Sequence, residues 1–403
     1  MLYVDFNSKL LGLEDVIIKS IENNCQHTEI SIEMQEKAHC CPCCQSTQSS
    51  IHDYRTQRIR DIPSFGKQVT LILRKRRYRC KHCGKRYAEV VSFLPRYYRM
   101  TNRLSAYVFD SLAGTGTFTD IAKEIGISTP TVMRIFDVVN YPTVQALPRV
   151  LAIDEFKGNT HGEQYQCILT DVENKVVLDI LPTRHETDVQ KYLRKCNREK
   201  VAYFVSDMWQ PYARIASTLL PKATQLVDKY HYVRQAVWAF EAVRKQEQKK
   251  FSDTHRRYFK RSKRILTMRE SKLTDEGRAQ LNVMLYASAT LSSAHFLKEK
   301  FLAILDEVNS SQAKAMFSKW ILTAQNSDIL QFQKCADTFI HWSKGILNTF
   351  DAPYTNGFTE GCNNKIKVLK RNAYGYRNFK RFRNRILHMF AYQHARYKKE
   401  AAA

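Results

Sequence analysis

Two aspartates follow apolar runs that are typical of buried strands, and their positions suit phosphoryl chemistry. Asp154 ends the run Leu151-Ala-Ile-Asp, and Asp207 ends the run Phe204-Val-Ser-Asp. Carboxylates at the carboxyl ends of strands in one sheet can face a common pair of metal ions, which lie about 4 Å apart and flank a scissile phosphate. Because side chains alternate along a strand, Asp154 and Glu155 point to opposite faces, and only one of them can serve such a site.

A third acid normally completes a two-metal cage, and Glu360 is the candidate. It leads a segment expected to be helical, and asparagines stand close to it in the sequence. The following turns carry four cations: Lys365, Lys367, Lys370 and Arg371. An acid this close to cations suits a site that binds metal and phosphate together. Residue types alone do not single out Asp154, Asp207 and Glu360, because the chain contains 39 Asp and Glu from which other trios could be chosen.

Two C-x-x-C motifs indicate a second kind of metal site. Cys41 and Cys44 form the first motif, and Cys80 and Cys83 form the second after a gap of 35 residues. A C-x-x-C turn points two thiolates at one tetrahedral centre, so two such turns complete a closed four-cysteine zinc site. Four thiolates leave no open coordination position, so the zinc is expected to be structural. The strand-like stretch between the motifs favours a zinc ribbon.

The register of the first motif is open in the sequence, because Cys40 and Cys43 form an alternative pair. We favour Cys41 and Cys44, since Pro42 then lies just inside the knuckle.

Residues 118–136 have the layout of a helix-turn-helix. Ala122 is small enough for a close helix crossing, Gly126 falls at the turn, and Val132 would pack the second helix onto the first. Pro130 suits the first turn of that second helix. The second helix would present three side chains to a major groove: Thr129, Thr131 and Arg134.

The charge of the chain points to a polyanionic partner. The formal net charge is +25, from 64 Lys and Arg against 39 Asp and Glu, and a basic excess of this size is typical of nucleic-acid-binding proteins. Residues 365–385 contain nine Lys and Arg and no acid, so this tail is expected to grip phosphates. Its aromatic residues could stack on unpaired bases: Tyr374, Tyr376, Phe379 and Phe382. The DNA-contacting cations are predicted to be Lys365, Lys367, Lys370, Arg371 and Arg377.

Hydropathy and cysteine usage indicate in which cellular compartment the protein is expected. No run of about eighteen uncharged apolar residues occurs, so a membrane span is not expected, and the first residues lack a signal-peptide layout. We expect a cytoplasmic protein. In that reducing environment the 11 cysteines are thiols or metal ligands rather than a disulfide framework.

Changes of composition divide the chain into segments of a multidomain α+β protein. Strands alternate with helices between residues 150 and 228, with a hairpin expected from 165–170 and 176–181, whereas residues 232–345 have helical spacing only. The predicted divisions are an N-terminal segment (1–36), a zinc ribbon (37–95), a helix-turn-helix domain (96–145), the first part of a mixed α/β catalytic domain (146–231), an all-helical insertion (232–345), and the last part of the catalytic domain with its basic tail (346–403).

The order of these motifs resembles one known family. After the cysteine pairs and the helix-turn-helix come Ala-Ile-Asp154-Glu-Phe, Val-Ser-Asp207-Met-Trp, Asp228-Lys-Tyr-His231 and Thr-Asn-x-x-Thr-Glu360-Gly-x-Asn. This series resembles the ISL-three family of bacterial insertion-sequence DDE transposases over nearly the whole chain. The stretch that follows Glu360, Lys-Arg-Asn-Ala-Tyr-Gly-Tyr-Arg-Asn-Phe, is the most specific part of the resemblance.

The resemblance implies an RNase H-like catalytic domain interrupted by an all-helical insertion before the helix that bears Glu360. It also implies that Asp154, Asp207 and Glu360 bind two Mg2+ (or Mn2+) ions, and that double-stranded transposon ends and target DNA are the substrates. The terminal inverted repeats would be bound by the zinc ribbon and the helix-turn-helix, and synapsis of two ends implies at least a dimer on DNA.

The resemblance further draws attention to Asp228 and His231 as supporting catalytic residues. Their i, i+3 spacing at a strand-to-helix junction can place both side chains on one face. His231 could then contact DNA or the scissile phosphate while Asp228 orients its ring. Alternatively, the pair only ties the strand end to the following helix.

Two other classes of protein stay open at this stage. A DNA-binding regulator would share the zinc ribbon and the helix-turn-helix, but it has no use for the Glu360 segment. A tyrosine recombinase needs a His-x-x-Arg box, which His231 and Arg234 match by spacing, but this class leaves the acids on the strands unexplained. The sequence does not determine the inverted-repeat sequence, the target preference or the transposition pathway.

Overall fold

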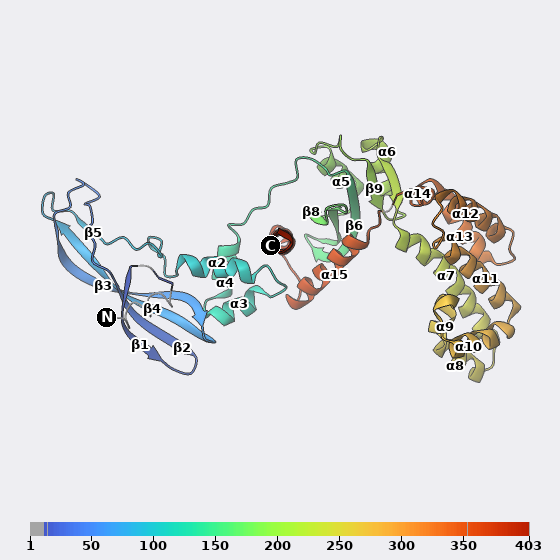
Figure 1. Ribbon diagram of the computed structural model, residues 1–403, viewed down its shortest axis with the longest axis horizontal. Helices are drawn as coiled ribbons and strands as arrows, with labels where there is room; N and C mark the ends of the chain where they lie inside the picture. Colours follow the sequence, from blue (N-terminus) through green and yellow to red (C-terminus); the bar gives the residue numbers. More distant parts are fainter. Residues whose placement is uncertain (1–11, 14, 353, 403) are drawn as a thin grey trace. The chain divides into compact units, whose positions relative to one another are not determined.

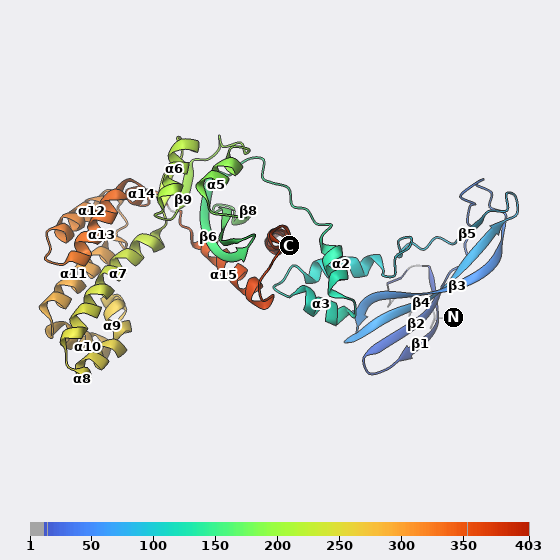
Figure 2. The same ribbon diagram turned by 180° about the vertical axis from the view of Figure 1, so that it is seen from behind.

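The computed structural model of the protein, drawn in Figures 1 and 2, describes residues 12–13, 15–352 and 354–402. The chain divides into two compact units. Each unit is assembled from separate stretches of sequence. The first unit comprises residues 1–141, 368–376 and 380–403, and the second comprises residues 142–367 and 377–379.

The first unit contains a twisted sheet with the strand order β1-β2-β4-β3, and β5 pairs with β4. Its strands are β1 (Val16–Asn23), β2 (His27–Met34), β3 (Ser49–Ser64), β4 (Lys67–Cys80) and β5 (Arg86–Ala88). Alternate apolar residues of β4, such as Leu71 and Leu73, are buried with Ile30 and Ile32 of β2. Because β2 and β4 are directly paired, the division predicted at residue 36 is not a break in the sheet.

Three short helices follow the sheet: α2 (Asn102–Ser111), α3 (Phe118–Ile125) and α4 (Thr129–Phe136). Thr117 and Asp120 form a reciprocal capping box at the start of α3. Gly126 ends α3 with φ +74°, a left-handed conformation that favours glycine. A Cβ at this position would also lie 2.0 Å from Oε1 of Gln68. The turn that was predicted between α3 and α4 therefore depends on Gly126 for its left-handed backbone, since the flexible end of the Gln68 side chain can move aside.

The C-terminal helix α16 (Phe379–Ala402) is assigned largely to the first unit, together with the three short helices. Arg385 of α16 is fully buried and donates hydrogen bonds to three backbone carbonyls, those of Leu112, Gly114 and Gly116. These carbonyls lie at and just beyond the end of α2, where helical hydrogen-bond partners run out. Burial lowers the pKa of Arg385 to about 10, so the guanidinium remains charged at neutral pH.

Replacing Arg385 by leucine should therefore destabilise the first unit. The change leaves three carbonyls without their charged donor, which costs on the order of 3 kcal/mol. Hydrogen exchange of the amides of α2 to α4 measures this local loss. Arg256→Leu, which removes an exposed arginine of α8 (Asp253–Arg261) in the second unit, is the matched control. Unchanged exchange in the Arg385 variant would contradict the structural role.

The second unit contains a five-stranded sheet with the order β10-β9-β6-β7-β8. Strands β9 and β10 run parallel to β6, whereas β7 and β8 continue as an antiparallel meander. The strands are β6 (Val150–Thr160), β7 (Glu163–Asp171), β8 (Val176–Leu181), β9 (Tyr203–Ser206) and β10 (Thr224–Val227). The hairpin predicted from residues 165–170 and 176–181 is confirmed as β7 and β8.

Strand β6 is longer than its apolar run predicted, so Asp154 does not end it. The parallel pairing with β9 stops at Ala152 and Val205, while the antiparallel pairing with β7 continues beyond Asp154, which faces Ile168. The antiparallel partner satisfies the backbone of β6 where the parallel partner has ended. Asp154 therefore lies at the carboxyl end of the parallel part of the sheet, inside a longer strand.

Alternating side chains of the sheet fill two different cores. Leu151, Ile153 and Phe204 pack with α5 (Glu186–Leu193) and α6 (Gln210–Leu219) on one face. The opposite core contains Val150, Ala152, Val205 and Leu226, with Ala352 from the segment just before α15 (Gly357–Asn372). In addition, Thr170 of β7 is hydrogen-bonded to Thr359 of α15 at 2.7 Å. The alternation thus decides which side chains face α15.

Between β10 and α15 the chain is helical, as the sequence predicted, and these helices have a large core of their own. Figure 1 shows them as a bundle into which α7 extends from the end of β10. The α-helices are α7 (Lys229–Glu247), α8 (Asp253–Arg261), α9 (Lys263–Thr267), α10 (Asp275–Tyr286), α11 (Ala289–Ile304), α12 (Ser310–Gln325), α13 (Leu330–His341) and α14 (Ser343–Asn348). None of the helices in the described part of the chain is both long and apolar enough to cross a membrane.

Candidate active site

Three aspartates are brought to one face of the second sheet by strand alternation. Asp154 is two residues beyond Ala152, Asp207 is two beyond Val205, and Asp228 is two beyond Leu226. Ala152, Val205 and Leu226 all belong to the core on the α15 face. Residues two apart in an extended chain point to the same face. The carboxylates therefore share that face, whereas Glu155 pairs with Arg184 at 2.8 Å instead.

His231 joins the aspartates from the first turn of α7. Its Nε2 lies 2.8 Å from Oδ1 of Asp207 and 3.8 Å from Oδ2 of Asp228. The candidate ligand atoms of these three residues lie within 4.8 Å of one another. Burial alone would lower the pKa of His231, but the hydrogen bond and charge of Asp207 outweigh burial and raise it. The predicted pair Asp228 and His231 thus lies beside the predicted acid Asp207.

Two buried asparagines, one just before helix α15 and one within it, face the aspartates. The backbone N–H of Asn356, just before the helix, donates to Asp228 at 3.1 Å, and the side chain of Asn363 donates to Asp154 at 2.8 Å. Glu360 lies between them in sequence, in the first turn of α15, and is exposed. Its charge contributes to raising the pKa of Asp228, although burial is the larger cause. Residues of the α15 region therefore contact Asp154 and Asp228, and Glu360 lies close enough for its charge to act on Asp228.

The electrostatics of the site fit a divalent cation. Burial, followed by the charge of Asp207, raises the pKa of Asp154 to about 7. Carboxylates that are buried close together resist simultaneous ionisation unless a cation compensates their charge. The Oδ1 atoms of Asn356 and Asn363 are also buried without a hydrogen-bond partner among the described residues. Carboxylate and amide oxygens are the donors that Mg2+ prefers.

The sequence places Asn363 three residues after Glu360, but it does not predict the contact of Asn363 with Asp154. The signal was the i, i+3 spacing between Glu360 and Asn363, which places the two side chains on the same helical face.

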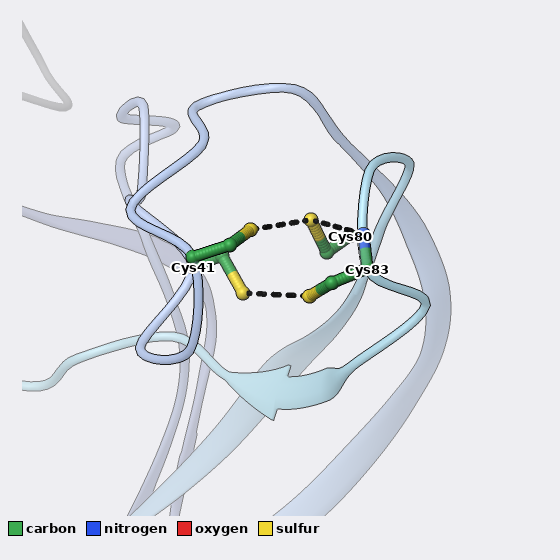
Figure 3. Close-up of side chains that lie close together, drawn as sticks. Cys41, Cys80 and Cys83 are labelled. Atoms are coloured by element: carbon green, nitrogen blue, oxygen red, sulfur yellow. Dashed lines mark hydrogen bonds between the residues drawn. The ribbon is translucent and has the colours of Figure 1, made fainter.

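The four predicted cysteine ligands form one cluster, as Figure 3 shows for Cys41, Cys80 and Cys83. The sulfur of Cys41 lies 3.5 Å from that of Cys83, and the sulfur of Cys44 lies 3.6 Å from that of Cys80. Sulfurs bound tetrahedrally at about 2.3 Å from zinc would be roughly 3.8 Å apart. The backbone N–H of Cys83 lowers the pKa of Cys80 to about 6, which favours the thiolate that binds metal.

The structure favours the Cys41 and Cys44 register, because Cys40 and Cys43 lie outside the cluster of four sulfurs. The two knuckles also have matching backbones. In the second, Gly84 follows the last cysteine with φ +70°, and in the first, Gln45 occupies the same left-handed position with φ +59°. The N–H of Gln45 bonds to the carbonyl of Cys41 just as that of Gly84 bonds to Cys80.

The predicted DNA-contacting residues of the helix-turn-helix lie on α4, with Thr129 and Thr131 in its first turn and Arg134 in its last turn. Thr129 and Thr131 are half-buried and Arg134 is exposed. The hydroxyl of Thr131 accepts a hydrogen bond from Arg134 at 3.1 Å. The cations predicted in the C-terminal part lie on or just after α15, and all are exposed except the half-buried Lys370: Lys365, Lys367, Lys370, Arg371 and Arg377.

The aromatic residues predicted to stack on bases are not all available. Phe382 is fully buried, and its ring stacks on that of Tyr376 at 4.6 Å between centroids. Tyr376 packs on the core of the three short helices, and Phe379 is half-buried. Tyr374, by contrast, is fully exposed. Likewise Arg385, at the end of the predicted phosphate-binding tail, is buried, because α16 closes the core of the first unit.

Comparisons with known proteins agree with this arrangement. Residues 151–386 match a family described as transposase, residues 37–83 match the zinc-finger of the transposases of IS204, IS1001, IS1096 and IS1165, and residues 89–139 match the helix-turn-helix domain of transposase family ISL3. The chain belongs to the ISL3 family of transposases, which confirms the resemblance seen in the sequence. Its domain order is zinc ribbon, helix-turn-helix and transposase domain.

Two of the individual relatives are also described as transposases, and a third has a different description. The chain is 26% identical to the transposase for insertion sequence element IS1001 of Bordetella parapertussis over 87% of its own length and 88% of the relative. It is 22% identical to the transposase for IS1557 of Mycobacterium tuberculosis over 57% of each chain. A stretch of 130 residues is 32% identical to a Lactococcus lactis protein described as an ATP-dependent protease, covering 37% of that protein.

The zinc site leads to a prediction about Cys41 and Cys40. Cys41→Ser should remove a ligand, lower the zinc content well below one ion per chain and unfold the ribbon, because metal binding and folding are coupled at structural zinc sites. Cys40→Ser should leave both unchanged. Elemental analysis and thermal unfolding of the two purified variants measure these effects. Equal zinc content in both variants would contradict the assigned register.

Proposed function

We propose that this transposase is a DDE enzyme in which Asp154, Asp207 and Glu360 hold two Mg2+ (or Mn2+) ions. The observation that carries the proposal is the convergence of Asp154 and Asp207 at the carboxyl end of the parallel pairing between β6 and β9, opposite the helix with Glu360. Mixed strand order and the helices between β10 and α15 support an RNase H-like domain with a helical insertion. The substrates would be transposon-end and target DNA.

When bound by Asp154, Asp207 and Glu360, two such ions would supply activation of a water, or later of a 3′-hydroxyl, and stabilisation of the leaving oxygen. The residues of the chain have separate tasks. Asp154 and Asp207 provide charged oxygens from a rigid sheet, and Glu360 provides one from the helix that also carries Asn363. Asn363 holds Asp154 in place through its amide hydrogen bond. Orientation of metal ligands by such neighbours is a general feature of metal sites.

The cations after Glu360 are proposed to bind the phosphates on both sides of the scissile bond. Lys365 and Lys367 are exposed on α15 within two turns of Glu360. Phosphate contacts by lysine and arginine position DNA without reading its sequence. The helix-turn-helix and the zinc ribbon would instead bind the terminal inverted repeats, and two bound ends would require at least a dimer.

Removing one charge from each proposed metal ligand tests the mechanism. Asp154→Asn, Asp207→Asn and Glu360→Gln should each abolish Mg2+-dependent cleavage of labelled DNA that carries the ends of the element. Binding of that DNA without metal should remain within about two-fold, because DNA affinity depends mainly on phosphate contacts by cations.

Glu155→Gln is the control for these variants, because Glu155 is adjacent in sequence but faces Arg184 on the other side of the sheet. It should keep most of the cleavage activity. Near wild-type cleavage by any one of the three proposed ligand variants would remove that residue from the site.

We further propose that His231 and Asp228 support catalysis beside the metal ligands. His231→Ala and Asp228→Ala should lower single-turnover cleavage by about 10- to 100-fold, the usual effect of losing a residue that orients a metal site. Thermal unfolding should change little. His341→Ala is the control, since His341 is an exposed histidine of the same unit that contacts Gln210. Parallel losses of stability and activity would leave only a structural role.

A further inference from the structure

One exposed face of α7 carries an arginine between two aromatic rings. Tyr230 is 50% exposed and Trp238 is 52% exposed. The guanidinium carbon of Arg234 lies 5.1 Å from the ring centre of Tyr230 and 4.4 Å from that of Trp238. Because these residues are four apart, they follow one another along the same side of the helix. The row presents planar groups to the solvent.

Folding of the helix does not account for this row. The opposite side of α7 contributes Tyr232, Ala236 and Phe240 to the core of the helical bundle, and that side anchors the helix. Single exposed aromatic residues are common on protein surfaces. Two large rings held on either side of a guanidinium are a more specific arrangement, because each cation–π contact fixes the orientation of both groups.

The row begins at the candidate active site. Nη2 of Arg234 lies 3.3 Å from Nδ1 of His231, whose other ring nitrogen contacts Asp207. The ring of Tyr230 packs edge-on against the ring of His231, at 5.6 Å between centroids. A strand whose phosphate reaches the carboxylates would therefore have its neighbouring nucleotide within reach of Tyr230 and Arg234.

We propose that Tyr230, Arg234 and Trp238 form a stacking platform for an unpaired base next to the scissile phosphate. Exposed aromatic rings and arginine planes bind single-stranded bases by stacking, whereas bases inside a duplex already stack on one another. The guanidinium also suits the negative charge of the DNA backbone. This inference rests on the proposed function, since the site determines which nucleotide lies nearby.

Binding measurements on the full chain test the platform without cleavage. The probes are DNA duplexes that carry one terminal inverted repeat of the element and its flank, studied in Ca2+. In one probe the nucleotide next to the scissile phosphate is an unpaired adenine, and in the other it is an abasic site. Wild-type protein should bind the first probe about ten-fold more tightly, as expected for stacking of one base.

Trp238→Ala should reduce this preference to less than about two-fold, whereas Trp238→Phe, which keeps a ring, should retain most of it. The matched control is Phe296→Ala on α11, because Phe296 is 54% exposed and has Lys300 Nζ 5.3 Å from its ring centre. The control should keep the full preference. Thermal unfolding of each variant verifies that the helical bundle is intact.

The binding and cleavage results together distinguish failure of the stacking platform from failure of the two-metal mechanism. If Trp238→Ala keeps the ten-fold preference for the adenine probe, or if wild-type protein has none, the platform is wrong even when Mg2+-dependent cleavage is normal. If the preference exists and depends on Trp238 while the wild-type protein cuts no DNA, the platform stands and the two-metal mechanism fails.

Discussion

Mutual repulsion among buried carboxylates is the constraint on which the second unit depends. Asp154, Asp207 and Asp228 lie on one face of the sheet, and burial together with neighbouring charge raises the pKa of Asp154 to about 7. Such a group of acids is unfavourable for folding unless the surrounding structure holds it in place. Parallel pairing of β6 with β9 and of β9 with β10 provides that support, because it brings the three aspartates side by side at the end of the parallel part of the sheet.

The neighbours of the acids compensate part of this cost with hydrogen-bond donors. The N–H of Asn356, the amide of Asn363 and the ring of His231 each meet a different aspartate. Two of these donors come from the α15 region and one comes from α7, so the segments on both sides of the helical bundle converge on the same site. The bundle can form between them because it has a hydrophobic core of its own.

The zinc ribbon and the three short helices of the first unit are small structures, and their hydrophobic cores alone provide little stability. The ribbon is stabilised by its four clustered cysteines, whose loops carry backbone N–H groups that favour thiolates. The three short helices are stabilised by α16, whose buried Arg385 donates hydrogen bonds to the carbonyls after α2. The two solutions use different chemistry for the same purpose, because small cores alone rarely provide sufficient stability.

The sequence by itself determined the order of the zinc ribbon, the helix-turn-helix and the transposase domain, because these depend on local spacing and on residue types with restricted chemistry. It predicted the trio of acids, and it left the register of the first cysteine pair open. It could not determine the length of β6, since the antiparallel partner that extends the strand past Asp154 lies in β7. Nor could it separate exposed from buried members of the basic tail, because the carbonyl of Leu112 that meets the buried Arg385 lies 273 residues earlier in the chain. The hydrogen bond between Asn363 and Asp154 spans 209 residues of chain. Only the tertiary structure decides such contacts, because they follow from the packing of the sheet against α15 rather than from any local pattern.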